Sequence, residues 1–120
     1  MEDSRKNQRH AKRLRAVLIV DEDGNQSKRH GRTHDVSSGG ASIISDYNLV
    51  SKHPITVCIL LRPGDQINPP LIFEAKSKVV HSVLSRQQGG FRISVEFISI
   101  AGDGATTLKK FLSASLATTG

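Results

Sequence analysis

The 120-residue sequence contains no tryptophan, one tyrosine and four phenylalanines, so it has few rings on which nucleic-acid bases could stack. It contains one cysteine, Cys58, which excludes an internal disulfide. No apolar run approaches the roughly 20 residues that a membrane-spanning helix needs. The charged N-terminus also lacks the apolar stretch of a signal peptide. These absences predict a protein of the reducing cytoplasm that does not insert into a membrane.

The sequence also lacks the usual motifs of enzymes and metal sites. There is no GxxxxGK[ST] phosphate loop, and no G-x-S-x-G elbow surrounds Ser37, although His34 and Asp35 lie close to it in sequence. His30 and His34 are four positions apart, which is roughly 13 Å on an extended strand. That separation is too large for one shared metal ion. We therefore expect no catalytic residue, no metal and no cofactor.

Positive charge is concentrated near the N-terminus. The chain has 17 lysines and arginines against 11 aspartates and glutamates, which gives a formal net charge of +6. Residues 5–15, RKNQRHAKRLR, contain six basic side chains and no acidic one. This distribution predicts an anionic partner that meets the N-terminal segment.

Turn-forming residues divide the chain into short β-type segments. Turn signals occur at 21–25, 37–40, 62–70, 86–90 and 101–104. The segments between them predict strands near 16–20, 27–36, 40–44, 55–61, 71–84 and 91–97. In the last segment Phe91, Ile93, Val95 and Phe97 alternate with polar residues, so this strand should have one buried face. Cys58 lies in the apolar run ITVCILL, and we expect it to pack as a small core residue.

The pattern changes after residue 104. Four apolar residues then recur at helical spacing: Leu108, Phe111, Leu112 and Leu116. Asp103, Thr106 or Thr107 could serve as the N-cap of a helix over about 104–117. The predicted fold class is therefore all-β with one C-terminal helix, built as a six-stranded antiparallel β-barrel. The expected organisation is a flexible basic arm at 1–13, followed by the barrel and its helix at 14–120.

Two short motifs could form one binding site. The first is Arg9-x-x-x-Arg13, in which two planar guanidinium groups could hold a phosphate, stack on a purine or bind the acceptors of guanine. The second is Asp35-x-Ser37-x-x-Gly40. Its carboxylate can accept hydrogen bonds from the N1 and N2 donors of guanine, and the serine hydroxyl can add another.

Each motif also has a simpler explanation. An arginine-rich run can be a solvated tail, and Asp-x-Ser-x-x-Gly can be an ordinary turn in which Asp35 caps its own backbone. The adjacent Gly39 and Gly40 would allow a ligand to approach the backbone closely, or would allow a positive φ.

Taken together and in this order, the motifs resemble those of the PilZ domain, the bacterial receptor for cyclic di-GMP. The resemblance runs from about residue 5 to residue 116 and implies a six-stranded barrel, with RxxxR before the first strand and DxSxxG between the second and third. It implies ligand-binding roles for the following residues: Arg9, Arg13, Asp35, Ser37 and Gly40. Further candidates are Arg5, Ser38 and Gly39. Arg5 and Arg9 form an overlapping RxxxR, but Arg13 lies closer to the first apolar segment. Ser94 occupies a position where family members often have glycine.

The resemblance implies a receptor or adaptor that binds cyclic di-GMP, orders its N-terminal arm and signals to a partner protein, without chemistry on the ligand. Two alternatives stay open: a small basic barrel that binds nucleic acid, and a PilZ-like adaptor that does not bind the dinucleotide. The scarcity of aromatic residues argues against nucleic-acid binding, and the intact motifs argue against an adaptor that does not bind the dinucleotide. The sequence does not identify the partner, which could belong to motility, pilus, polysaccharide or signalling machinery. It also leaves the number of bound ligands and the oligomeric state open.

Overall fold

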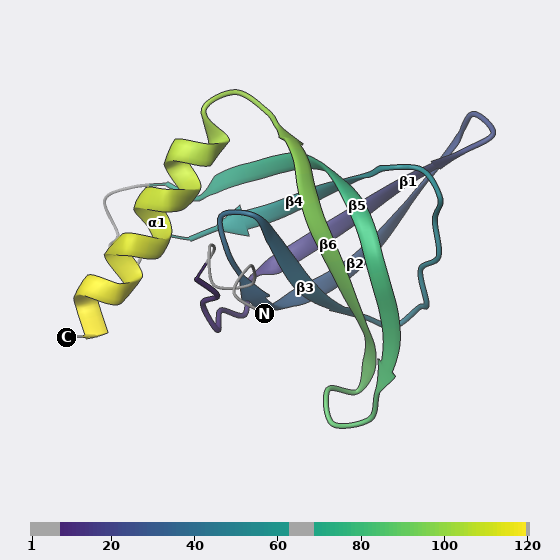
Figure 1. The fold of residues 1–120 in the computed structure, drawn as a ribbon, viewed down its shortest axis with the longest axis horizontal. Helices are drawn as coiled ribbons and strands as arrows, with labels where there is room; N and C mark the ends of the chain where they lie inside the picture. The colour runs from purple at the N-terminus through teal and green to yellow at the C-terminus, as the bar shows by residue number, and fades with distance from the viewer. Residues whose placement is uncertain (1–7, 63–68, 120) are drawn as a thin grey trace.

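Six antiparallel strands form a closed barrel in the order β1-β2-β3-β6-β5-β4, and one helix lies at an end of it (Figure 1). The computed structural model describes residues 8–62 and 69–119, with side chains described to residue 113. The strands are β1 (Arg15–Glu22), β2 (Asn25–Val36), β3 (Gly40–Ser45), β4 (Ile55–Leu61), β5 (Leu71–Ser85) and β6 (Gly90–Ile100), and the helix is α1 (Gly104–Thr119). This architecture confirms the predicted fold class and all six predicted strands.

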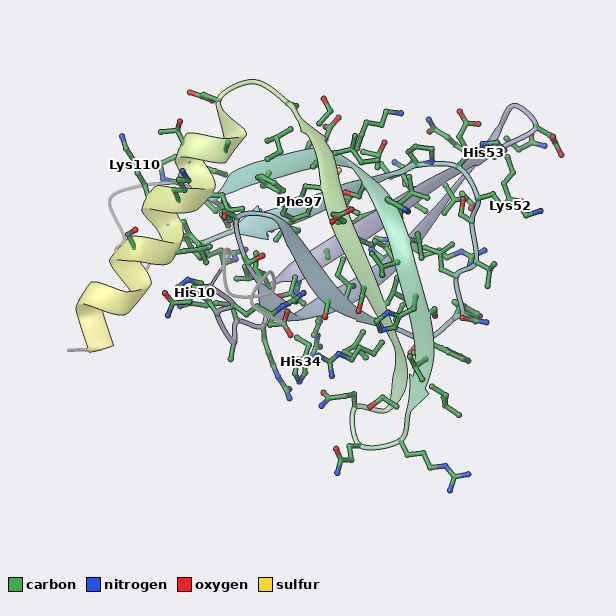
Figure 2. All side chains as sticks on the ribbon, viewed as in Figure 1. His10, His34, Lys52, His53, Phe97 and Lys110 are labelled. Atoms are coloured by element: carbon green, nitrogen blue, oxygen red, sulfur yellow. The ribbon has the colours of Figure 1, made fainter. Side chains whose placement is uncertain are left out.

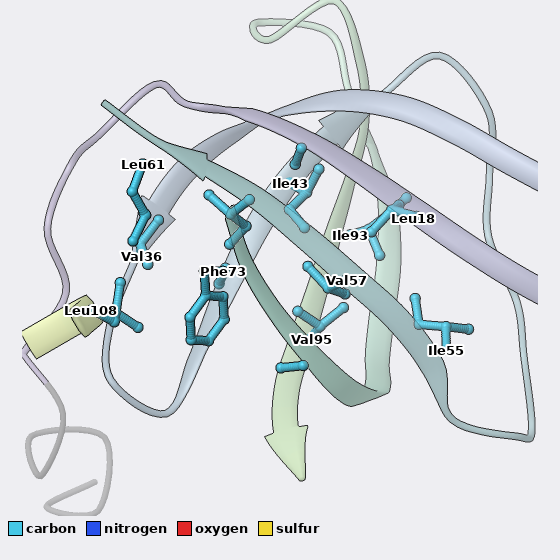
Figure 3. Packing of buried hydrophobic residues seen from close by; sticks show 14 of the residues in the cluster. Leu18, Val36, Ile43, Ile55, Val57, Leu61, Phe73, Ile93, Val95 and Leu108 are labelled. Atoms are coloured by element: carbon cyan, nitrogen blue, oxygen red, sulfur yellow. The ribbon is translucent and has the colours of Figure 1, made fainter. Parts of the chain in front are cut away.

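The barrel interior is filled by the inward-facing residues of every strand. Period-two alternation is clearest in β4, where Ile55, Val57, Ile59 and Leu61 are buried. Large side chains from the other strands, including Leu18, Ile43, Phe73 and Ile93, meet them in one cluster (Figure 3). The predicted alternation of β6 also holds, with Ile93 and Val95 buried and Phe91 and Phe97 half-buried against the core.

Cys58 does not pack in the core, so that expectation was wrong. The same alternation that buries Val57 and Ile59 turns Cys58 to the outer face, where it is half-buried. The sequence concealed this because the run ITVCILL is apolar on both faces of the strand. Burial, followed by the nearby charge of Glu74, raises the pKa of the Cys58 thiol, and Lys28 partly opposes the shift.

The polar segment over 27–36 does form a strand, because its neighbours supply the pairing that its composition does not predict. β2 pairs with β1 from Arg15↔Arg32 to Glu22↔Asn25, and its second half pairs with β3. Asp23 and Gly24 both have positive φ at the tip of the β1–β2 hairpin, which is typical of a tight Asp-Gly turn.

A β-bulge at His34 interrupts the pairing of β2 with β3. Thr33 pairs with Ile43 and Asp35 pairs with Ser42, so His34 is the extra residue. Ile43 points into the core. The preceding residue on β3, Ser42, therefore points to the outer side, together with its partner Asp35. The bulge thus directs Asp35 to the outside of the barrel.

The helix α1 covers one end of the core. Leu108 and Leu112 are buried and belong to the same core cluster as Phe73, Val36 and Leu61 (Figure 3). Because α1 begins at Gly104, the N-cap position belongs to Asp103, whose backbone carbonyl accepts hydrogen bonds from the amide and hydroxyl of Thr107. The predicted Leu116 contact lies outside the described side chains. Within residues 8–62 and 69–119, no helix has the length and apolarity needed to cross a membrane.

We predict that iodoacetamide alkylates Cys58 in the folded protein more slowly at pH 8 than it alkylates an exposed cysteine in a peptide. The raised pKa leaves less of the reactive thiolate at this pH, and partial burial limits access. Mass spectrometry over time gives the rate, with urea-unfolded protein as the control. Equal rates for folded and unfolded protein would contradict the half-buried position.

Candidate functional site

Asp35 is the centre of a charged cluster on the outer face of the barrel. Its side chain is only 10% exposed, and two arginines and one histidine lie against its oxygens. Arg9 forms an ion pair with Oδ1, while His34 Nδ1 lies 3.2 Å and Arg92 Nη2 3.5 Å from Oδ2. A carboxylate that is so nearly buried needs such compensation, because burial of an unpaired charge is costly.

Backbone hydrogen bonds place Arg9 beside Asp35. His10 donates to the carbonyl of Val36 at 2.8 Å and accepts from the Val36 amide at 2.9 Å, which forms an isolated antiparallel bridge. His10 and His34 accordingly lie on the same side of the barrel (Figure 2). The bridge holds the chain immediately before β1 against the end of β2, next to the carboxylate.

A second anchor follows a few residues later. The hydroxyl of Thr33, which is buried, accepts a hydrogen bond from the Leu14 amide at 2.8 Å and donates to the Lys12 carbonyl. Lys12 also places its ammonium 5.7 Å from the centre of the Phe111 ring on α1. The segment between Arg9 and β1 therefore contacts both the barrel and the helix.

Arg13 lies at a different part of the same face from Arg9. It lines an open cavity of about 890 Å³, whose wall also includes Arg15, Arg32 and His34. The apolar floor of this cavity comes from outward-facing residues of neighbouring strands, including Val17, Ile44, Leu60 and Ile72. The structure thus joins Arg9 to Asp35 and places Arg13 over the adjoining cavity.

Ser37 shapes the loop between β2 and β3. It is buried, and its hydroxyl accepts hydrogen bonds from the amides of Gly39 at 3.2 Å and Gly40 at 3.1 Å. Its own amide donates to the Gly40 carbonyl at 2.8 Å. These contacts close the loop and hold Ser38 and Gly39 at its half-exposed tip.

Gly40 is required by strand packing and not by an unusual backbone angle. A Cβ atom at this position would lie 2.3 Å from the carbonyl oxygen of Val95 on β6, a distance that no side chain tolerates. Positive φ occurs at Gly24, Gly89 and Gly102 among the described glycines, and neither glycine of the loop is among them. The close approach of β3 to β6 therefore explains this glycine.

Several residues of this surface were not identified from the sequence. The strand register aligns Asp35, Ser42, Ser94 and His81 in one row across β2, β3, β6 and β5. Ser94 Oγ lies 3.3 Å from His81 Nε2, and Arg92 reaches Asp35 from the same strand as Ser94. The predicted alternation of β6 does place Arg92 and Ser94 opposite the buried face, but no sequence motif links them to Asp35.

Two remaining expectations concern Arg5 and a metal. Arg5 lies outside the described residues. In the part of the chain that the structure describes, no group of three or more potential metal ligands comes together.

Comparison with known proteins gives both a family and a fold. The sequence profile of the PilZ domain matches residues 3–114 of the chain. No curated protein is a significant sequence match.

Three solved structures are similar in fold. The Bacillus subtilis inhibitor of motility MotI/DgrA has a TM-score of 0.71 at 16% identity, over 93% of this chain and 51% of that one. The PilZ domain of CeSA from a cellulose-synthesizing bacterium has a TM-score of 0.55 at 18% identity, over 90% and 98% of the two chains. The PilZ domain of Escherichia coli YcgR, solved with c-di-GMP, has a TM-score of 0.54 at 13% identity, over 91% and 88%. The chain spans about half the length of MotI/DgrA.

We predict that Gly40→Ala lowers the free energy of unfolding by about 1–3 kcal/mol, because the added methyl group must push β3 away from the Val95 carbonyl. Thermal or urea unfolding followed by circular dichroism measures the loss. An unchanged free energy of unfolding would show that β3 and β6 can move apart without cost. Strand packing would then not explain Gly40, and only a role in the ligand site would be left for it.

Proposed function

Because the chain belongs to the PilZ domain family, we propose that it is a receptor for cyclic di-GMP that signals to a partner protein. The observation that carries the proposal is the Asp35 carboxylate, which is nearly buried and paired with Arg9, beside a cavity lined by Arg13. The YcgR PilZ domain, which has the same fold, was solved with this dinucleotide.

Binding would proceed by exchange at the carboxylate. The N1 and N2 donors of a guanine replace the Arg9 guanidinium at Oδ1 of Asp35. Arg9 is then free to stack on the purine or to hold a phosphate, and Arg13 approaches the ligand from the cavity. His34 and Arg92 lie near Oδ2, the carboxylate oxygen that this exchange does not involve. No bond of the ligand is made or broken, so the protein acts without catalysis and without a cofactor.

The loop residues divide into two roles under this proposal. Ser37 and Gly40 are buried and fix the shape of the loop, while Ser38 and Gly39 lie at its half-exposed tip, where a ligand can approach. A ligand-facing loop that is held by its own hydrogen bonds costs little entropy to order on binding.

Signalling would use the N-terminal segment. Residues 1–13 form an arm whose attachment to the barrel is strengthened by the ligand, so that a partner protein recognises the ordered form. The described part of the arm is held by the bridge at His10, the ion pair at Arg9 and the contacts of Lys12 with Thr33 and Phe111. The ion pair makes this attachment sensitive to events at Asp35. We place this switch in the cytoplasm and expect its partner in motility, pilus, polysaccharide or signalling machinery.

We predict that Arg9→Ala and Arg13→Ala each weaken cyclic di-GMP binding tenfold or more, on the order of 1.5–3 kcal/mol for a charge-assisted hydrogen bond. Isothermal titration calorimetry measures the affinity. Lys110→Ala, an exposed change on α1, is the control for loss of one positive charge. Arg5→Ala should have the smaller effect. An essential Arg5 with a dispensable Arg13 would show that the other RxxxR register is used.

The same titration separates the receptor from a nucleic-acid-binding barrel. Cyclic di-GMP carries two phosphates, so its affinity should fall gently with salt, whereas a protein that covers many phosphates loses affinity steeply. GTP and a mixed oligonucleotide serve as comparison ligands. Tight oligonucleotide binding with a steep salt slope, and no response to cyclic di-GMP, would favour the nucleic-acid alternative.

We predict that amide hydrogen exchange within Gln8–Arg13 slows when cyclic di-GMP is added. The few contacts of this segment, which include the isolated bridge at His10, open at small cost, since terminal segments unfold locally far more easily than the barrel. Exchange followed by mass spectrometry or NMR provides the measurement, with the core strand β4 as the internal reference. Strong protection of Gln8–Arg13 without ligand would contradict the arm mechanism.

A further inference from the structure

Three arginines lie in one row on the outer face of the barrel. The strand register pairs Arg15 with Arg32, Arg32 with Ile44, Ile44 with Arg92, and Arg92 with Val83. Directly paired residues of neighbouring strands share a face of the sheet. Since the preceding or following residues Ala16, Ile43 and Ile93 are buried in the core, the whole row points outward.

Among the described residues, this row carries more positive charge than the nearby acids neutralise. Arg15 and Arg32 are exposed and stand directly opposite each other, an arrangement that is destabilising for like charges. Within residues 8–62 and 69–119 every ion pair has Asp35 as its acid, and only Arg92 of the row takes part in one. Of the described residues on the cavity wall, Asp46 is the one acid, against Arg13, Arg15 and Arg32. A bound anion would relieve this repulsion.

The position of the row relative to Asp35 indicates which kind of anion fits. Asp35 pairs with Ser42, two residues before Ile44 on β3, and Ser94 lies two residues after Arg92 on β6. The carboxylate row and the arginine row are therefore about 7 Å apart along the strands. A guanine nucleotide has its hydrogen-bond donors at the base edge and its negative charge at the other end, so it can contact both rows.

The spacing within the row suits a ligand with an apolar face between its charges. Arg32 and Arg92 flank Ile44 and are two strand spacings apart, about 10 Å at the backbone. Ile44 is half-buried and belongs to the cavity floor. Its side chain offers a surface for the ribose or the purine ring, and each guanidinium fork can hold a phosphate bidentately.

We propose that Arg32 and Arg92 bind the phosphodiester groups of the cyclic dinucleotide whose guanine contacts Asp35, with Arg15 adding positive charge beside Arg32. The inference rests on the proposed function and extends the site beyond the two sequence motifs. According to this inference, Arg32 and Arg92, which are 60 positions apart in the chain, contact the ligand directly and contribute to its affinity.

The test is calorimetric titration with cyclic di-GMP of the wild type, Arg32→Gln, Arg92→Gln and Arg92→Lys. Lys28→Gln is the matched control, because it removes one positive charge from the exposed face of β2 outside the arginine row. We expect Arg32→Gln and Arg92→Gln each to weaken binding about tenfold, as loss of a charge-assisted contact does. Arg92→Lys should recover only part of the loss, and Lys28→Gln should bind as the wild type does.

Thermal unfolding separates ligand contact from a structural role. Because Arg32 repels Arg15, Arg32→Gln should leave the melting temperature unchanged or raise it while it weakens binding. In NMR spectra of the wild type, the Nε–Hε signals of Arg32 and Arg92 should shift when cyclic di-GMP is added. A structural role alone would lower the melting temperature and leave these signals in place.

The outcomes that overturn the inference differ from those that overturn the receptor function. If Arg32→Gln and Arg92→Gln bind cyclic di-GMP as tightly as Lys28→Gln does, the arginine row is not part of the site. The receptor function would still stand. If only Arg92→Gln weakens binding and Arg32→Gln does not, the inference is also overturned. The contact between Arg92 and Asp35 would then explain the weaker binding by itself. If the wild type does not bind cyclic di-GMP at all, both proposals fail together.

Discussion

The charged surface of this protein depends on one carboxylate that is almost buried. Asp35 retains 10% of its side-chain exposure, and the guanidinium of Arg9, the imidazole of His34 and the guanidinium of Arg92 share its two oxygens. Removing any hydrogen-bonded partner from such a group without replacement is costly. A ligand that brings its own N–H donors can replace a partner at a far smaller cost. The same pairing that stabilises the carboxylate therefore also makes it selective for ligands with donors at the correct positions.

Closure of the barrel is what assembles this pairing. Arg92 is 57 residues from Asp35 in sequence and approaches it only because β3 pairs with β6. That pairing needs Gly40, where the Val95 carbonyl occupies the space of a Cβ atom. The bulge at His34 then turns Asp35 outward to meet Arg92. A glycine and a single extra residue thus connect the packing of the core to the electrostatics of the outer face.

The sequence predicts the fold well and the site only in part. Apolar β-type segments between Gly- and Pro-rich turns identify five strands, and helical spacing identifies α1, because these signals are local. The polar strand over 27–36 is indicated only by its position between two turns. The outward position of Cys58 was missed because its strand is apolar on both faces. Loop motifs identify Arg9, Arg13 and Asp35 as candidates, but the contacts of Arg92 and the rows of Ser42, Ser94 and His81 arise from strand register. Register between distant strands has no local signature.

The arrangement of charge also links ligand affinity to the stability of the free protein. Arg15 and Arg32 repel each other across two paired strands, and the Asp35 cluster holds more cations than its one carboxylate neutralises. This repulsion is part of the free energy of the fold, and the dianionic ligand that we propose would remove it on binding. Unbalanced charge on a rigid barrel lowers the free energy of unfolding of the unbound protein. An anion that relieves the repulsion binds more tightly for the same reason. Because core strands fix the backbone under each arginine, the ligand needs to order only side chains and the short segment that carries Arg9.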